Sequence, residues 1–394
     1  MLDPYRRILV LPGALAFSLA GLLARAPISM VSLGIVLLVA DRTGSYGYAG
    51  AVAASQVVAG AVCTPVQGRL MDRFGQFRLL PVAGTVFAAG VLATAVAVES
   101  GQAAPVPHVC AAVAGAGLPP VGSAVRARWR HLLEDRAQLD TTFALEAVVD
   151  EIVFVVGPVL VTLLATQLPA WSGLAVAGAL GLTGALVLAS QRATEPPVAP
   201  RGGDRHRTPM SWPGLACLAV VGAGLGGIFG ATEVVTVAFA DEAGTTAAAG
   251  PMLAVWATGS LLAGLIIGTR TQQRHALTRL RWSIAGLTAA MAVLAFLPGI
   301  TSVTVVLFVA GFAIAPTLIA TISLVEQTVP RSRLTEGISW ISTGIAAGVA
   351  PGAAISGQVI DAAGASVAYL VPLASGLLAV LASFMLRRPS ARGL

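Results

Sequence analysis

Long apolar runs separated by short polar segments repeat along the whole chain. Each run is long enough to cross a bilayer, since a spanning α-helix needs about 20 predominantly apolar residues. The pattern predicts an all-α membrane protein with twelve transmembrane helices, at about 9–39, 47–67, 79–98, 106–126, 141–165, 170–190, 213–240, 248–268, 281–298, 301–326, 337–360 and 366–386. Only Pro298 and Gly299 mark the break between the ninth and tenth helices. The first run is too long for the apolar core of a secretory signal, so we expect it to remain as a helix.

The composition agrees with this pattern and excludes several classes of protein. Of the 394 residues, 56% are hydrophobic and 11% are charged, whereas a soluble domain carries roughly 25% charged residues. All 24 basic residues are arginine, so the lysine that a P-loop ATPase requires is missing. The cysteines lie in or beside apolar runs, without the spacing of a disulfide framework or a metal site. They are Cys63, Cys110 and Cys217.

The arginines alternate from loop to loop. The loops on one side hold 22 of the 24 arginines, and the other side holds only Arg42, beside acidic residues. Arginine-rich loops face the cytoplasm under the positive-inside rule, so twelve helices place both termini inside. This topology explains the net charge of +6 without a nucleic-acid partner. Arginine without lysine, together with high Ala and Gly content, indicates a GC-rich bacterial genome, so we expect a multi-pass protein of the bacterial inner membrane.

The chain divides into two halves. Residues 191–211 are rich in Pro, Gly and Arg and have no apolar period, which predicts a cytoplasmic linker between six-helix bundles at 1–190 and 212–394. A shift of 200 residues aligns several positions of the two halves without a gap. The matches include Ala40-Asp41 with Ala240-Asp241, Gly44 with Gly244, and Gly68 with Gly268. Their common offset indicates a parallel repeat of six helices.

The loop between the second and third helices carries the most specific motif. Its sequence, Gly68-Arg-Leu-Met-Asp72-Arg73-Phe-Gly75-Gln-Phe-Arg78, resembles the signature loop of the major facilitator superfamily. In that family the loop is a cytoplasmic latch between the two halves of a transporter, so the resemblance implies a latch made by these five numbered residues. The alternative is an ordinary charged turn. The family further implies two bundles that rock around a site at the midplane, which helices one, four, seven and ten line.

Arg25 lies near the middle of the first predicted helix. A charge there costs about 2.5–3.5 kcal/mol on insertion scales, so it should face a wet cavity or an opposite charge. Ser29 and Ser32 share its helical face, and Pro27 permits a kink because it removes a backbone hydrogen bond. We interpret Arg25 as a substrate or coupling residue, with both serines lining the cavity. The alternative is a structural ion pair between two helices.

The fifth predicted helix supplies acidic partners for this arginine. Glu146 and Asp150 stand four residues apart and share a face, where two carboxylates repel each other and proton uptake by one of them is favoured. If the first and fifth helices touch, as the family implies, Arg25 should pair with Asp150. These three residues are the candidates for proton coupling. The alternative is a buried ion-pair network that never titrates.

Gly157 and Pro158 mark a possible hinge in the same helix. The pair resembles the core of the fifth-helix signature of proton-driven drug exporters, and this resemblance implies a drug/proton antiporter. The match is partial, since Val159 and Leu160 follow the proline where that signature has small glycines. A simple proline kink is the alternative.

Polar residues of the second half complete the candidate cavity. Glu233 and Thr236 lie in the seventh predicted helix, and Thr317 and Thr321 lie in the tenth. Each has a structural alternative, because small polar residues also join membrane helices. Arg126–Arg130, at the inner end of the fourth helix, is expected to be an interfacial anchor.

These patterns together favour a secondary active transporter and not an enzyme. The histidines fall in loops or at helix ends and form no metal or nucleophile motif; they are His108, His131, His206 and His275. We expect proton-coupled efflux of a small, moderately apolar compound by alternating access. A monomer in the lipid bilayer would do this, with a small-molecule substrate and protons as partners and without a cofactor, metal or nucleic acid. The alternatives are a proton-coupled importer of an anionic metabolite, and a non-transporting membrane receptor or scaffold on the same fold.

Overall fold

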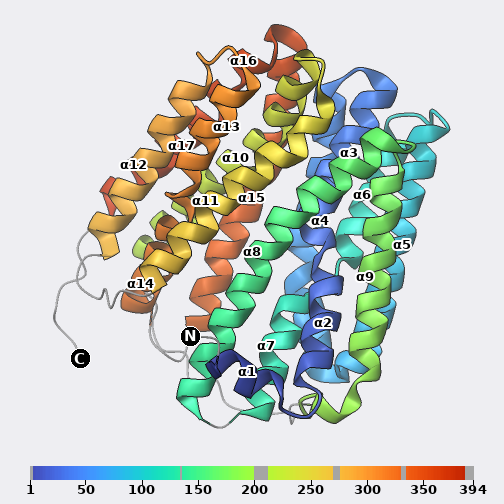
Figure 1. Ribbon diagram of the computed structural model, residues 1–394, viewed down its shortest axis with the longest axis vertical. Coiled ribbons are helices and arrows are strands. Elements are labelled where there is room, and N and C mark those ends of the chain that lie inside the picture. Colours follow the sequence, from blue (N-terminus) through green and yellow to red (C-terminus); the bar gives the residue numbers. More distant parts are fainter. Residues whose placement is uncertain (1–2, 134, 199–211, 269–275, 330–333, 387–394) are drawn as a thin grey trace. The chain divides into compact units, whose positions relative to one another are not determined.

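The computed structural model describes residues 3–133, 135–198, 212–268, 276–329 and 334–386, and every regular element in these ranges is a helix (Figure 1). Eleven helical segments are long and apolar enough to cross a membrane. They are Ala14–Thr43, Tyr46–Phe74, Gln76–Glu99, Pro105–Leu132, Thr141–Gln167, Ser172–Ser190, Trp212–Glu242, Thr246–Ile266, Ile300–Thr328, Gly337–Ala363 and Ala365–Met385. Helix α12 (Ala276–Leu294), with Arg279 and Arg281 near its start, is the remaining segment of the predicted twelve. The all-α membrane fold is therefore confirmed.

The contacts divide the chain into two compact units. Unit 1 comprises Met1–Thr43 and Ser55–Gly202, and unit 2 comprises Gly44–Ala54 and Gly203–Leu394. The helices of unit 1 are α1 (Asp3–Leu9), α2 (Ala14–Arg25), α3 (Pro27–Thr43), most of α4 (Tyr46–Phe74), α5 (Gln76–Glu99), α6 (Pro105–Gly117), α7 (Val121–Leu132), α8 (Arg136–Gln167), α9 (Ser172–Ser190) and η1 (Arg192–Thr194). Those of unit 2 are the start of α4, α10 (Trp212–Glu242), η2 (Thr246–Ala248), α11 (Ala249–Gly268), α12, α13 (Ile300–Gly311), α14 (Ile314–Thr328), α15 (Leu334–Ala363), α16 (Ala365–Ala368) and α17 (Leu370–Met385).

Several predicted spans consist of two helices in sequence. The first span breaks at Ala26, where α2 ends and α3 begins at Pro27, as expected from a residue that cannot donate a backbone hydrogen bond. The fourth span breaks at residues 118–120 between α6 and α7, and the tenth breaks at residues 312–313 between α13 and α14. In contrast, α8 continues through Pro158. Pro158 therefore lies within a continuous helix.

Two glycines in corresponding places of the repeat share an unusual backbone conformation. Gly44 has φ +66° and Gly244 has φ +73°, a region that L side chains rarely adopt. They stand 200 residues apart, and each follows the end of a spanning helix, α3 and α10 respectively. The shared turn conformation agrees with the repeat that the sequence predicts.

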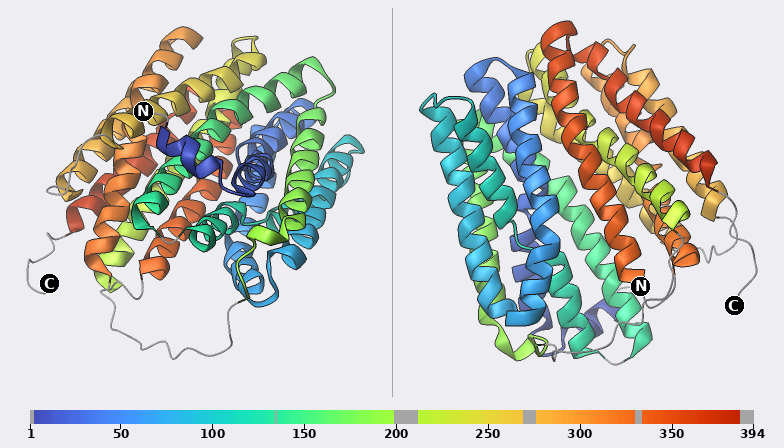
Figure 2. Two further views of the ribbon diagram at one scale, coloured as in Figure 1. Left: turned by 60° about the horizontal axis from the view of Figure 1, so that its bottom comes forward. Right: turned by 180° about the vertical axis from the view of Figure 1, so that it is seen from behind.

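Small residues bring the helices of each unit close together. In unit 1, α5 packs between α6 and α9 (Figure 2), and Gly90 and Gly117 leave room for the α6 and α5 backbones to meet. In unit 2, α10 and α15 form the most extensive contact, with Gly226 and Gly348 facing carbonyl groups of the opposite helix. Such close approach is how membrane helices gain packing energy without a hydrophobic driving force.

Candidate functional site

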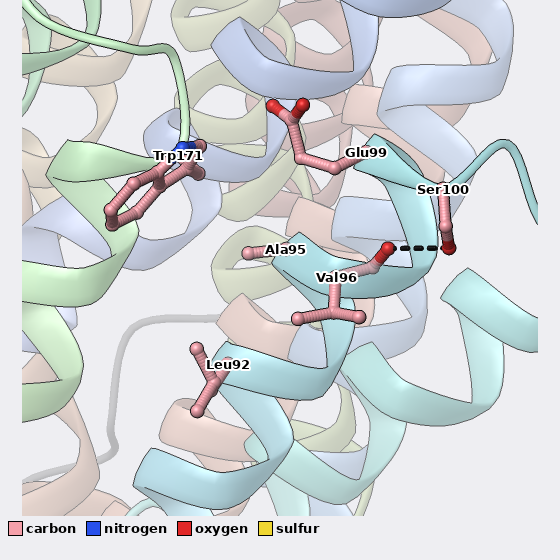
Figure 3. A pocket seen from close by; sticks show the side chains of 6 residues that line it. All are labelled: Leu92, Ala95, Val96, Glu99, Ser100 and Trp171. Carbon is pink, nitrogen blue, oxygen red and sulfur yellow. Dashed lines mark hydrogen bonds between the residues drawn. The ribbon is translucent and has the colours of Figure 1, made fainter.

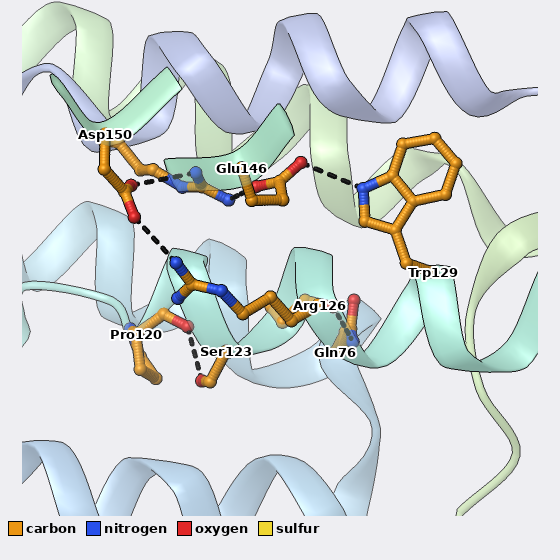
Figure 4. A network of polar contacts seen from close by, with 9 residues as sticks. Gln76, Pro120, Ser123, Arg126, Trp129, Glu146 and Asp150 are labelled. Carbon is orange, nitrogen blue, oxygen red and sulfur yellow. Dashed lines mark hydrogen bonds and ion pairs between the residues drawn. The ribbon is translucent and has the colours of Figure 1, made fainter. Parts of the chain in front are cut away.

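A network of four charges, two of them buried, joins three helices of unit 1 (Figure 4). Arg25, from α2, forms an ion pair with Glu146, and its other terminal nitrogen lies 3.0 Å from Asp150 Oδ1. Arg126, from α7, donates to Asp150 Oδ2 at 2.7 Å. The indole Nε1 of Trp129 donates to Glu146 Oε1 at 2.9 Å. Every oxygen of the two carboxylates thus has a donor, and two positive charges balance two negative ones.

The helical periods explain how the sequence builds this network. Glu146 and Asp150 lie one turn apart on α8, and Arg126 and Trp129 lie three residues apart on α7, so each pair shares a face. Arg25 is the last residue of α2, immediately before the break at Ala26. The three helices are in mutual contact. The predicted pair of Arg25 with Asp150 is therefore present, and Glu146 joins it.

The two ends of the network differ in exposure. The side chains of Arg25 and Glu146 are each 2% exposed, whereas those of Asp150 and Arg126 are each 37% exposed. Glu146 is therefore enclosed by Trp129 and Arg25, while part of the Asp150 carboxylate lies at the surface of the protein.

One donor of Arg25 is unused. Among the residues that the structure describes, no acceptor lies within hydrogen-bonding distance of its buried Nε. A Cβ atom built on Gly122 of α7 would lie 3.9 Å from this nitrogen. A buried guanidinium with an unused N–H can accept a further polar partner, such as a substrate oxygen or a water molecule.

Helix α3, the second part of the first predicted span, makes another contact with α8. Ser29 Oγ lies 2.8 Å from the carbonyl oxygen of Val153 and 3.2 Å from that of Ala26. A Cβ atom at Gly157 would collide with this hydroxyl, so the glycine lets α3 and α8 approach each other. Ser32, the other predicted cavity residue of this helix, is partly buried.

The candidates of the second half lie in unit 2. Thr236 on α10 is fully buried, and Glu233, one turn before it, is partly buried. Thr317 and Thr321 on α14 are buried, and their hydroxyls donate to carbonyl oxygens of their own helix at 2.7 and 2.8 Å. Helices α10 and α14 are in contact.

The motif loop is a tight turn between α4 and α5. Gly75 has φ +87°, which explains the glycine, and a Cβ atom there would also lie 2.8 Å from Glu195 Oε1. Asp72, Arg73 and Arg78 are exposed. The guanidinium groups of the two arginines lie 5.0 and 5.1 Å from the ring centroids of their neighbours, Phe74 and Phe77 respectively.

Packing against a neighbouring helix does not explain the glycine at residue 68. A Cβ atom there would meet no heavy atom within 4 Å. Its counterpart in the repeat, Gly268, ends α11, and the residues after it, 269–275, lie outside the described ranges.

The segment Arg126–Arg130 is the part of the site that sequence reasoning placed least well. Arg128 is fully buried, not interfacial. It donates to Gln76 Oε1 at 2.7 Å, to Thr194 Oγ1 at 2.8 Å, and to the carbonyl oxygens of Leu188 and Gln191 at 2.8 Å. It therefore ties the start of α5 to the end of α9. The three-residue spacing of Arg126 and Trp129 puts them on one face and Arg128 on another, but the spacing does not tell which face meets α8.

The described residues offer no group of three or more His, Cys, Asp or Glu side chains that could hold a metal ion. The network itself consists of ion pairs and hydrogen bonds between helices of unit 1.

Comparison with known proteins identifies the class and then the family. Solved structures of membrane transporters match the fold over nearly their whole length. The POT family transporter PepTSo aligns with a TM-score of 0.74 and 11% identity, covering 94% of this chain and 96% of that one. The nucleoside transporter NupG aligns with a TM-score of 0.70 and 15% identity, covering 95% and 99%. At these identities the likeness shows the fold.

The family model described as Major Facilitator Superfamily matches residues 17–312. An uncharacterized MFS-type transporter, y4rN of Sinorhizobium fredii (strain NBRC 101917 / NGR234), is 29% identical over 410 residues, which cover 95% of each chain. This chain belongs to the Major Facilitator Superfamily and is a multi-pass membrane transporter. Family membership favours a transporter over an enzyme.

Proposed function

We propose that the chain is a secondary active transporter that exports a small, moderately apolar compound in exchange for protons by alternating access. In this proposal it works as a monomer in the bacterial inner membrane, with both termini in the cytoplasm. Residues 1–190 and 212–394 form the two bundles, and 191–211 joins them. The observation that carries the proposal is the balanced network in which one acid, Asp150, is accessible and the other, Glu146, is sealed.

The coupling step follows from charge balance. A proton on Asp150 removes one negative charge and leaves the network with a net charge of +1, so Arg25 and Arg126 lose part of their attraction to α8. Arg126 is 37% exposed and can turn toward water, whereas Arg25 is buried and keeps Glu146. Protonation therefore loosens the contact of α7 with α8 while leaving that of α2 with α8 in place. Such a change in contacts can bias a two-state equilibrium.

The remaining candidate residues have distinct parts in this cycle. Ser29 and Ser32 border the coupling site, and Glu233, Thr236, Thr317 and Thr321 contribute the cavity wall of the second half. The loop of Gly68, Asp72, Arg73, Gly75 and Arg78 is the latch. Gly157 and Pro158 are the point where α8 adjusts. The exposure of Asp72, Arg73 and Arg78 supports the latch, since their charges are available to a moving partner.

The test is proton movement driven by substrate in proteoliposomes. A resistance screen against a panel of compounds would first supply a substrate, and an internal pH-sensitive dye would then follow protons when that compound is added. The wild-type chain should move protons opposite to the compound, and Asp150→Asn should exchange the compound without moving protons. Asp41→Asn, which changes an exposed acid outside the network, is the control. Proton movement equal to wild type in Asp150→Asn would remove Asp150 as the coupling residue.

A second candidate function is supported by the unused donor of Arg25. A buried guanidinium N–H suits a carboxylate or phosphate oxygen, which favours import of an anionic metabolite. Accumulation of the compound in cells that express the chain is compared with accumulation in cells that lack it. A lower level in expressing cells means export, and a higher level means import. Absence of any flux in proteoliposomes would instead favour a receptor or scaffold.

A further inference from the structure

An open groove of about 400 Å³ lies on unit 1 beside the C-terminal end of α5 (Figure 3). Its lining is Leu92, Ala95, Val96, Glu99, Ser100 and Trp171. Five of these residues belong to the last turns of α5 and its C-cap, and Trp171 is the N-cap of α9. The groove is therefore formed where two spanning helices meet at one end of the unit.

The walls of the groove are apolar and face outward. Leu92 and Val96 are 56% and 57% exposed, and Trp171 is 41% exposed. Ala95, at 4% exposed, forms the floor. In a membrane-spanning unit such a surface meets hydrocarbon, and a tryptophan near the end of a spanning helix is typical of the level of the lipid headgroups. The groove thus runs from hydrocarbon depth to headgroup depth.

The rim of the groove carries a net negative charge. Arg42, at the end of α3, donates from Nε and from a terminal nitrogen to Glu99 Oε1 at 3.0 and 2.9 Å. Asp41 Oδ2 lies 3.8 Å from the Arg42 guanidinium. One positive and two negative charges leave a net charge of −1. Ser100 Oγ donates to the carbonyl oxygen of Val96 at 2.7 Å, and a hydroxyl oxygen that donates can still accept a hydrogen bond.

We propose that this groove binds a phospholipid with a primary-amine headgroup, of the phosphatidylethanolamine type. One acyl chain lies along Leu92 and Val96 over the Ala95 floor, and the ammonium group lies against Glu99 and Ser100. Arg42, 45% exposed, is available to the lipid phosphate. The net negative rim disfavours a lipid with net negative charge, and a choline headgroup has no N–H to donate. In one zwitterionic lipid the amine can pair with Glu99 while the phosphate pairs with the neighbouring Arg42.

Fluorescence quenching by brominated lipids tests the proposal with the full chain in nanodiscs. The signal of Trp171 is the difference between the wild type and Trp171→Phe. Brominated phosphatidylethanolamine should quench that signal at a mole fraction about two- to fivefold lower than brominated phosphatidylcholine, as expected from an exposed ion pair. Equal quenching by the two lipids, or no quenching of Trp171 by either, would overturn the proposal.

Two variants separate the headgroup from the groove. Glu99→Gln should make the two lipids equal, and Glu326→Gln, at an exposed acid of α14 in unit 2, should keep the preference. Ala95→Leu fills the floor and should weaken quenching by both lipids, which keeps the proposal testable if Glu99→Gln does not fold. Circular dichroism confirms that each variant retains its helices. A preference for the amine lipid that persists in Glu99→Gln would contradict the assignment of the rim.

Discussion

Gly157 and Ser29 meet where α8 crosses α3, and the serine hydroxyl occupies the place that a side chain at residue 157 would need. That hydroxyl is itself held by the carbonyl oxygen of Val153, at 2.8 Å. The glycine is therefore explained by a close contact between two helices. Close packing thus accounts for the glycine whether or not α8 also bends at Gly157 and Pro158.

Gly157→Ala should destabilise the protein because the new methyl group displaces Ser29. Overpacking of this kind costs typically about 1–3 kcal/mol, and thermal unfolding in detergent measures it. The matched control is Gly286→Ala in α12, where a Cβ atom would meet no heavy atom within 4 Å. A melting temperature lowered equally in both variants would mean that the effect is not contact with Ser29.

Arg25→Ala should be more damaging than either change to its acidic partners. It leaves Glu146 buried with only Trp129 as a described donor and removes one of two arginines from Asp150. Breaking a buried ion pair on one side costs roughly 3–5 kcal/mol. The double variant Arg25→Ala with Glu146→Gln should recover part of that loss, because the stranded charge is gone. Unfolding of both variants in detergent gives the comparison, and a double variant no more stable than Arg25→Ala would argue against charge as the cause.

Trp129→Phe should weaken the same network from its other end. The phenyl ring keeps the packing against Phe17, whose ring centroid lies 4.6 Å from that of the indole, but it cannot donate to Glu146. Loss of a hydrogen bond to a charged group costs about 1.5–3 kcal/mol. Trp340→Phe, at a half-exposed tryptophan of unit 2, is the control for ring size. Unfolding of Trp129→Phe at the wild-type temperature would show that this hydrogen bond is dispensable.

Much of the network could be predicted from sequence, and the reason is periodicity. A four-residue spacing puts Glu146 and Asp150 on one face whatever they contact, and a charge in an apolar run needs a partner, which singled out Arg25. Arg126 could not be assigned in the same way. Whether an arginine near a helix end turns toward lipid headgroups or toward a neighbouring helix depends on the rotation of α7 against α8, which no local pattern encodes.

The latch loop shows the same limit. Its motif predicted a loop between two helices, and the structure has a tight turn there with a positive φ at Gly75. The contact of Glu195 Oε1 with the backbone N–H of Phe77, at 3.1 Å, joins the start of the expected linker to that loop across 118 residues of sequence. A pairing so distant along the chain leaves no trace in spacing or composition.

Asp72→Asn should leave stability unchanged and slow transport. Asp72 is exposed, and no ion pair or hydrogen bond joins it to another described residue of unit 1, so folding does not depend on it. If the loop is a latch, loss of the charge shifts the balance between the two states of the cycle. Substrate flux in proteoliposomes and thermal unfolding are measured on the same preparation. Unchanged flux at normal stability would identify the loop as an ordinary turn.

Asp361→Asn should release the start of α4 within unit 2. The Asp361 carboxylate, in the last turn of α15, accepts hydrogen bonds from the backbone nitrogens of Tyr46 and Gly47, at 2.8 and 2.9 Å, and from Ser45 Oγ at 2.6 Å. It thus caps the N-terminus of a spanning helix, where a negative charge also interacts favourably with the helix dipole.

Loss of a capping side chain costs typically about 0.5–2 kcal/mol, and the amide keeps only one acceptor oxygen and no charge. Ser45→Cys, in a chain without its three native cysteines, reports the effect as the rate of labelling by a membrane-impermeant maleimide. That rate should rise when Asp361→Asn is added and should stay unchanged with Asp41→Asn, whose carboxylate lies 3.8 Å from the Arg42 guanidinium and on another helix, α3. Because the reporter removes the Ser45 hydroxyl, any remaining protection reflects the two backbone contacts. A labelling rate that is the same with and without Asp361→Asn would mean that these contacts do not hold the helix start in place.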